Sequence, residues 1–194
     1  MLCIIPTSSM SKNNSREDTS CYLALNESSC IGTKILVAYF ENSTIQAIML
    51  GSNLESLLTD LQNLYPQLKF VQKFESKQSL ELVKKLENYI VNPKQNYLDF
   101  NLKLEGTEFQ KLVWAELCRI PYDSLCTYSD IARHIGRPKS ARAVANACGQ
   151  NNIPIIIPCH RVIRSDGSYG GYSSGKHIKE TLIKIEQDVM SGRK

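Results

Sequence analysis

A cysteine at the end of a strongly apolar run limits what this 194-residue chain can be. Four of the five residues in 153–157 are isoleucine, and Pro158, Cys159 and His160 follow at once. Such a run predicts a buried strand that ends at a turn, with the cysteine sulfur at its rim. Most cysteines are inert core residues, but a neighbouring histidine and the cationic Arg161 favour a thiolate. We therefore predict that Cys159 is a reactive nucleophile.

Composition indicates an ordinary globular protein, with 42% hydrophobic and 22% charged residues. No apolar run reaches bilayer length, and the first five residues lack the basic flank of a signal peptide. Seven cysteines without a Cys-x-x-Cys pair fit a reducing compartment. The three histidines are too far apart in the sequence for a zinc-ligand spacing. We expect a cytoplasmic protein that binds no membrane and no metal.

The net charge of +4 is unevenly distributed. Residues 1–100 hold 9 Lys and Arg against 10 Asp and Glu, whereas residues 101–194 hold 14 against 9. The basic excess suggests a polyanionic partner for the second half, although a solvated face produces the same excess.

Apolar periodicity divides the chain into four parts, and the second is an α/β domain. Within it the pattern predicts a β-hairpin over 34–50, a helix over 53–65, a strand at 70–74 and a helix over 79–91. This half contains no motif that indicates a catalytic or binding function. The four parts are a flexible N-terminal segment (1–33), an α/β N-terminal domain (34–95), a linker (96–106) and a C-terminal domain (107–190).

The C-terminal domain contains a predicted helix-turn-helix. Thr107 and Gln110 form a capping-box pattern that opens a helix ending at Pro121. A short helix over 129–135 and a second over 138–149 follow, joined by a tight turn, as in DNA-binding motifs. The second helix carries four alanines and is nearly bare, which suits either close packing or a close approach to a DNA groove. Three nearby cations favour DNA: Arg137, Lys139 and Arg142.

After the cysteine, the sequence predicts a turn at 165–168, a glycine-rich loop at 169–175 and a final helix over 176–190. Glu186 lies close to the apolar stripe of that helix. A carboxylate at the edge of a core needs a polar partner, and His160 is the candidate.

These motifs resemble the O6-alkylguanine-DNA alkyltransferases. The similarity is carried by residues 158–163, by the Ser140–Val144 helix segment and by Asn151. It is strongest to the bacterial adaptive-response type, although no clustered cysteines mark the zinc-binding phosphotriester domain of that type. The resemblance implies a ribonuclease H-like α/β layer followed by a mainly helical, winged-helix-like domain with the helix-turn-helix.

The resemblance also implies the chemistry. Cys159 takes the alkyl group from guanine O6, His160 withdraws the thiol proton through a water, and Glu186 stabilises the imidazole. Tyr128 donates to the leaving guanine and crowds the adjacent phosphate. The thioether product has no good leaving group, so each molecule reacts once and needs no cofactor.

For DNA, the resemblance implies minor-groove binding by a monomer, with the damaged base flipped out of the duplex. Arg142 fills the gap left by the base, and Ser129, Arg137 and Ser165 contact the phosphates. In a bacterium the location is cytoplasmic and nucleoid-associated. The implied substrate pocket is formed by Asn151, Pro154, Val162, Ser173, Ser174 and Lys179. Ser174 stands where the family varies between glycine and tryptophan, so the preferred size of alkyl group stays open.

Two other functions remain open at this point. A Cys-His hydrolase would turn over an ester and would need an oxyanion hole. A non-catalytic module that binds damaged DNA would keep its function without Cys159.

Overall fold

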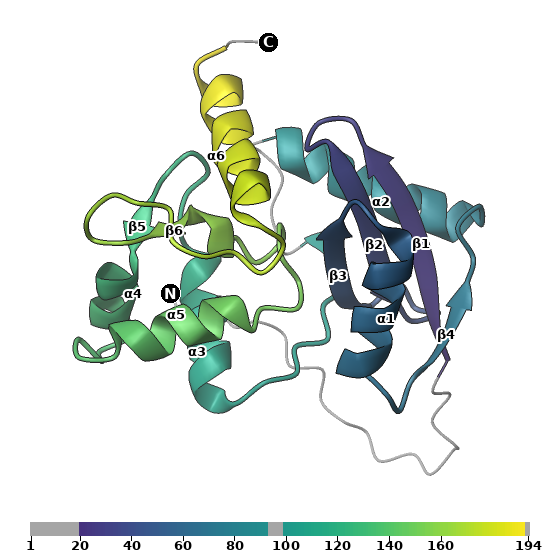
Figure 1. Ribbon diagram of the computed structural model, residues 1–194, viewed down its shortest axis with the longest axis horizontal. Coiled ribbons are helices and arrows are strands. Elements are labelled where there is room, and N and C mark those ends of the chain that lie inside the picture. The colour runs from purple at the N-terminus through teal and green to yellow at the C-terminus, as the bar shows by residue number, and fades with distance from the viewer. Residues whose placement is uncertain (1–19, 93–98, 193–194) are drawn as a thin grey trace.

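The computed structural model describes residues 20–92 and 99–192. A four-stranded sheet with a helix on each face is followed by a mainly helical part (Figure 1). This confirms an α/β N-terminal layer and a helical C-terminal domain. The predicted flexibility of the first 19 residues lies outside the described residues.

The sheet contains β1 (Ser20–Ser28), β2 (Thr33–Tyr39), β3 (Ile45–Gly51) and β4 (Lys69–Gln72), in the order β3-β2-β1-β4. The β2–β3 hairpin and the strand near residue 70 are confirmed. The prediction that residues up to 33 are flexible is wrong for β1, which pairs antiparallel with β2 and parallel with β4. Two buried β1 residues, Cys21 and Leu23, pack on one face of the sheet and Ala24 on the other, which fixes the strand in place.

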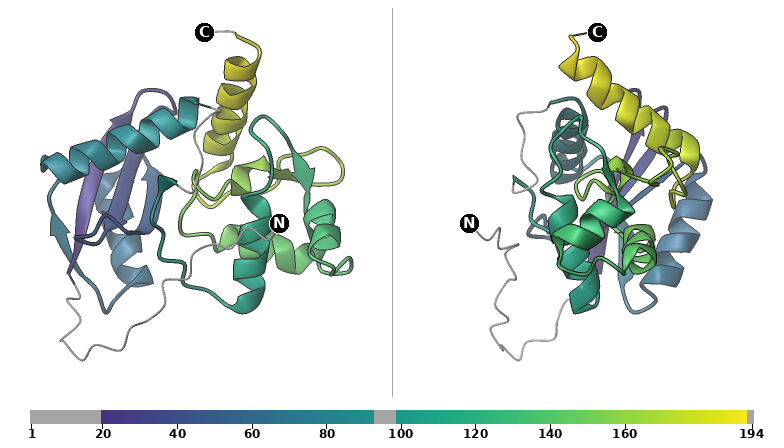
Figure 2. Two further views of the ribbon diagram at one scale, coloured as in Figure 1. Left: turned by 180° about the vertical axis from the view of Figure 1, so that it is seen from behind. Right: turned by 90° about the vertical axis from the view of Figure 1, so that its left-hand side faces the viewer.

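Two helices cover the sheet from opposite sides (Figure 2). Helix α1 (Leu54–Leu64) packs Leu57 and Leu61 on one face, and α2 (Lys77–Val91) packs on the other. Helix α1 begins within one residue of the prediction, and α2 begins two residues earlier than predicted. A side chain caps the first turn of each: Asn53 accepts from Ser56 N, and Ser76 accepts from Ser79 N.

The segment predicted as a linker joins the sheet. Ile45 N donates to Asn101 O at 2.8 Å, and Lys103 N donates to Ile45 O at 2.9 Å. The described part of the segment, residues 99–106, therefore borders the outer edge of β3 before the chain enters the C-terminal domain.

The C-terminal domain packs four helices around the cysteine: α3 (Glu108–Leu117), α4 (Tyr128–His134), α5 (Ala141–Gly149) and α6 (Lys176–Met190). A small parallel pair, β5 (Cys126–Thr127) and β6 (Val162–Ile163), lies among them. The capping box at Thr107 is present, and α6 has the predicted bounds.

Helix α5 is shorter than predicted. It begins at Ala141 because residues 137–140 form a turn in which Ser140 N donates to Arg137 O at 2.9 Å. Pro138 therefore lies in the turn and not in the first helical turn. Helices α4 and α5 still form the predicted helix–turn–helix pair, and Gly136 ends the region of α4 with φ +71°.

The predicted strand over 153–157 is wrong. These residues form a turn in which Ile157 N donates to Ile153 O at 3.1 Å and Ile155 has φ +74°. Pro154 and Pro158 lack the N–H that a strand ladder needs. Asn151 supplies side-chain partners to the turn instead.

Within the described residues, no helix is both long and apolar enough to cross a membrane. The same residues contain no cluster of three or more His, Cys, Asp and Glu side chains suited to a metal ion.

Candidate active site and DNA-binding surface

Cys159 begins a 3₁₀ turn, Cys159–Arg161, and only 4% of its surface is exposed. The amide of Asn151 holds its sulfur, with Nδ2 at 3.1 Å from Sγ. The same Nδ2 donates to Ile157 O at 2.9 Å, while Oδ1 accepts from Ile153 N at 3.0 Å. One side chain therefore fixes both ends of the isoleucine turn and the thiol that follows it.

The thiol is more strongly buried than the sequence indicated. Burial raises the pKa of Cys159, and the Asn151 hydrogen bond, the Lys179 charge and the neighbouring Tyr172 hydroxyl only partly offset this rise. The Tyr172 hydroxyl is buried beside the sulfur without a well-directed hydrogen bond in the described part of the chain. The sulfur therefore rests as a thiol and not as the thiolate that its charged neighbours favoured, and its proton must leave when the sulfur reacts, as the resemblance implies.

His160 and Glu186 meet as predicted. His160 Nε2 lies 2.9 Å from Glu186 Oε1, and both residues are buried. Burial lowers the pKa of His160 despite the carboxylate, so the ring is neutral at pH 7. With Nε2 donating to the carboxylate, Nδ1 carries the lone pair, and it has no partner among the described residues. The ring is thus ready to accept a proton at Nδ1.

Arg161 binds the same carboxylate, a contact that was not predicted from the sequence. Its Nε lies 3.1 Å from each oxygen of Glu186, its Nη2 lies 2.9 Å from Oε1, and its Nη1 donates to Ile120 O. Burial alone would raise the pKa of Glu186, but His160 and Arg161 lower it to about 2. The sequence places Arg161 next to His160, but the burial that makes a carboxylate partner necessary is visible only in the structure.

Tyr128 and Lys179 border the glycine-rich loop. A Cβ at Gly170 would lie 3.4 Å from the Tyr128 hydroxyl, so loop and ring are in contact. Burial raises the pKa of Tyr128, which keeps its hydroxyl protonated as a donor. Lys179 Nζ, fully buried, donates to Val162 O and Tyr169 O, both at 2.5 Å. The lysine thereby ties the loop to the strand that follows the cysteine.

A pocket of about 140 Å³ separates the active-site loop from the N-terminal layer. Four of the six predicted pocket residues line it, whereas Val162 and Lys179 lie outside its lining. The other wall comes from β3 and α1, which the sequence did not place near the site. The lining shared by the two domains includes Asn151, Pro154, Ser173 and Ser174 on one side and Met49, Leu57, Asp60 and Leu64 on the other.

The predicted phosphate-contacting residues lie on the surface of the helix pair. Ser129 Oγ and Ser165 Oγ, 36 positions apart in sequence, lie 3.4 Å from each other. Arg137 lies over the Phe109 ring at 5.9 Å from its centroid. Arg142 is exposed on the first turn of α5.

Comparison with known proteins identifies the family. Residues 108–188 match the family described as 6-O-methylguanine DNA methyltransferase, DNA binding domain. A methylated-DNA–protein-cysteine methyltransferase of Methanosarcina barkeri is 50% identical over 108 residues, which is 56% of this chain and 68% of the relative. The chain belongs to this family. The Ada protein of Escherichia coli, a bifunctional transcriptional activator and DNA repair enzyme, is 37% identical over 80% of the chain, which spans 43% of that longer relative. This supports an Ada-like type of methyltransferase.

Solved structures of the methyltransferase family share the fold. Mycobacterium tuberculosis OGT in complex with DNA superposes with a TM-score of 0.68 at 29% identity, covering 88% of this chain and 94% of that one. The O6-methylguanine-DNA methyltransferase of Pyrococcus kodakaraensis gives the same TM-score at 24% identity, covering 86% and 98%. The α/β layer and the helical domain therefore occur together in relatives from distant organisms.

Proposed function

We propose that this protein repairs O6-alkylguanine in DNA by transferring the alkyl group to Cys159 in a single turnover. The observation that carries this is the buried thiol next to a neutral His160, which is held by an ionised Glu186. Family membership supports the same reaction, since the relatives are named methylated-DNA–protein-cysteine methyltransferases.

The transfer breaks the bond between guanine O6 and the alkyl carbon and forms a carbon–sulfur bond. The thiol proton passes to Nδ1 of His160, through a water if the two do not touch. Glu186 stabilises the resulting imidazolium, which is the usual division of labour in a Cys-His-carboxylate site. The guanine leaves with a negative charge on the base, and the Tyr128 hydroxyl donates to it. The thioether that remains cannot be displaced, and the reaction needs no cofactor.

The base must leave the duplex to reach a buried sulfur, and extrusion costs a few kcal/mol. We assign this work to the helix-turn-helix, with α5 in the minor groove, where its alanines permit close approach. Arg142 would occupy the gap in the base stack. Ser129, Ser165 and Arg137 would bind the phosphates, a role supported for the two serines by their proximity.

Several finer assignments are part of the proposal. The sheet with helices on both faces suits a ribonuclease H-like layer, and the β5–β6 pair beside α4 and α5 suits a winged helix. Ser173 would present its N–H to guanine O6 inside the pocket. The protein would act as a monomer at chromosomal DNA, and its cytoplasmic, nucleoid-associated location stays a prediction.

The test is duplex DNA carrying labelled O6-methylguanine. One methyl per protein should appear on the peptide that contains Cys159, and the Cys159→Ser variant should take up none. Label on Cys148 or Cys126, or repeated turnover, would contradict the proposal. Turnover of a simple ester would point to a hydrolase instead. Unchanged protection of damaged DNA by the Cys159→Ser variant would point to a non-catalytic binding module.

A further inference from the structure

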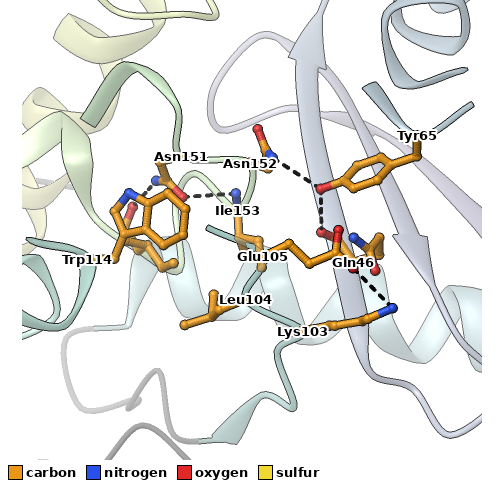
Figure 3. Close-up of a pocket in the computed structure, with 10 residues that line it drawn as sticks. Gln46, Tyr65, Lys103, Leu104, Glu105, Trp114, Asn151, Asn152 and Ile153 are labelled. Atoms are coloured by element: carbon orange, nitrogen blue, oxygen red, sulfur yellow. Dashed lines mark hydrogen bonds and ion pairs between the residues drawn. The ribbon is translucent and has the colours of Figure 1, made fainter. Parts of the chain in front are cut away.

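The N-terminal layer has no catalytic residue, yet it is hydrogen-bonded to the turn that carries the active site. Ile48 N of β3 donates to Asn152 O at 2.8 Å. Asn152 Nδ2 donates to the Tyr65 hydroxyl at 3.1 Å. Figure 3 shows this second bond crossing from the end of α1 to the turn, beside a small cavity lined by both domains. Asn152 is thus held by its main chain and its side chain at once.

The next residue back in the chain is the one that holds the thiol. Asn151 bonds Cys159 Sγ, Ile157 O and Ile153 N. Figure 3 shows the contact with Ile153. The planar peptide unit between Asn151 and Asn152 passes the position of one to the other. A movement of Asn152 away from β3 and α1 therefore shifts the main chain of Asn151, whose side-chain amide contacts the sulfur.

The turn also needs support from outside. Ile155 has φ +74°, a conformation that is costly for a β-branched residue and persists only where surrounding contacts impose it. Tyr89 of α2 donates to Ile156 O, but at 3.5 Å this is the longer contact. Gln46 lines the same cavity as Tyr65, and its buried side-chain amide has no partner within the described residues. Two tyrosine hydroxyls of the N-terminal layer thus reach the turn, and Tyr65 makes the shorter hydrogen bond: 3.1 Å to Asn152, against 3.5 Å from Tyr89 to Ile156.

We propose that Tyr65 is a positioning residue that acts through Asn152 and Asn151 to hold the Cys159 thiol in its reactive place. This rests on the proposed alkyl transfer to Cys159. The α/β layer then contributes to the reaction as a brace for the active-site turn. Loss of the Tyr65 hydroxyl removes the side-chain bond of Asn152 and leaves only its main-chain bond to Ile48. Asn152 is then held less firmly, and the Asn151 amide is less well aligned with the sulfur.

Two effects follow from a misplaced Asn151. The sulfur loses a fixed approach direction, and small displacements of reacting groups cost roughly tenfold to a hundredfold in rate. The Asn151 hydrogen bond also lowers the pKa of the Cys159 thiol against the effect of burial, so weakening it moves the pH–rate profile to higher pH. A purely structural hydroxyl would change the melting temperature and leave that profile in place.

The decisive experiment compares Tyr65→Phe with Tyr39→Phe. Tyr39 is a matched control because its buried hydroxyl also joins two elements, bonding Ser79 Oγ at 2.8 Å between β2 and α2, away from the turn. Each variant is reacted with duplex DNA carrying O6-methylguanine, from neutral to mildly alkaline pH. We expect Tyr65→Phe to react roughly tenfold more slowly at neutral pH and to recover as pH rises, while Tyr39→Phe matches wild type.

A double-mutant cycle with Asn152→Ala tests the link itself. If Tyr65 acts through Asn152, the double variant is no slower than the slower single variant. Additive losses, or equal rates and pH profiles for Tyr65→Phe and Tyr39→Phe, would overturn the inference.

A second readout does not depend on DNA repair. Alkylation of Cys159 by iodoacetamide, followed on its own peptide by mass spectrometry, should show the same upward pH shift in Tyr65→Phe. If wild type takes no methyl from DNA, the proposed function fails. The iodoacetamide profile still decides whether Tyr65 positions the thiol.

Discussion

Glu186 binds two side chains that differ in charge, the cationic Arg161 and the neutral His160. Arg161 approaches both of its oxygens and keeps the carboxyl group ionised, while His160 takes one oxygen and stays neutral because it is buried. The negative charge is therefore present before the histidine receives a proton. When Nδ1 is protonated, the new positive charge appears next to an anion that is already in place, so little rearrangement is needed.

Replacing Glu186 by glutamine keeps an oxygen for His160 Nε2 but removes the charge. We expect Glu186→Gln to slow alkyl transfer at neutral pH by about a hundredfold, the scale of general-base assistance. The rate should recover as pH rises, because the thiol then ionises without help. The measurement is the rate of alkyl transfer from O6-methylguanine DNA as a function of pH. Glu87→Gln, which alters a half-buried carboxylate bonded to Asn26, is the control and should react like wild type.

The same carboxyl group predicts how stability responds to acid. Its pKa falls from 4.5 to about 2 on folding, so the ionised form stabilises the fold above pH 4.5 and the contribution is lost as pH falls through about 2. The shift corresponds to roughly 3 kcal/mol. Urea unfolding should give wild type a higher free energy of unfolding than Glu186→Gln at neutral pH. The difference between the two proteins should become smaller in acid. If the difference in unfolding free energy is the same at both pH values, the pairing with His160 and Arg161 does not lower the pKa of Glu186.

At the level of single residues, the sequence was sufficient for groups that lie close in the chain or have only one plausible partner. Glu186 had to meet a polar group because it borders an apolar stripe, and His160 was that group. Arg161 was missed because its bidentate contact depends on how α6 crosses the 3₁₀ turn. The depth of burial of the Cys159 thiol was missed because burial is a property of the tertiary fold.

Among the elements, helices were predicted with near-correct bounds because their caps and periodicity are local signals, as at Thr107 and Ser76. The flexible N-terminal segment and the strand over 153–157 were predicted wrongly. Strand β1 lies between β2 and β4 in the sheet, and its place there depends in part on β4, where Lys69 pairs with Ser20 from 49 residues away. The isoleucine run has strand propensity, but two prolines and the Asn151 side chain impose a turn.

Helix α5 carries the next prediction. Arg142 is exposed near its start, and a guanidinium can stack in the place of a flipped base, whereas an ammonium offers charge alone. Arg142→Ala should slow repair of duplex DNA about a hundredfold or less, within the few kcal/mol that base extrusion costs, and should spare reaction with the free modified base. Arg142→Lys should behave like the alanine variant. Full activity of the lysine variant would mean that charge attraction is the only contribution.

Both domains are needed to form the pocket beside the active-site turn. The pocket of about 140 Å³ is closed by the glycine-rich loop on one side and by β3 and α1 on the other, so neither domain forms it alone. On the same measure, about 10–15 Å³ is enough to hold one water molecule. The pocket therefore has room for several groups of that size. Cys159 does not line it, but Asn151 does, and Asn151 contacts the Cys159 sulfur.

We expect free O6-benzylguanine to inactivate the protein, with the ring against Pro154 and about 25 cal/mol gained for each Å² of apolar surface buried. Ser174→Trp should protect against it by filling the pocket, while O6-methylguanine repair continues. Ser174→Ala, which removes only a hydroxyl, should remain as sensitive as wild type. Residual repair activity after incubation is the measurement, and a resistant wild type would show that position 174 does not control entry.

Helix α6 supplies both Glu186 and Lys179, and it is translated after the cysteine that these residues serve. Proteins emerge from the ribosome from the N-terminus onward, and their parts fold as they become available. A nascent chain that has exposed Cys159 therefore still lacks the carboxylate that orients His160 and the lysine that anchors the loop. The site that controls the thiol thus exists only after the last helix has been made and packed against the cysteine turn.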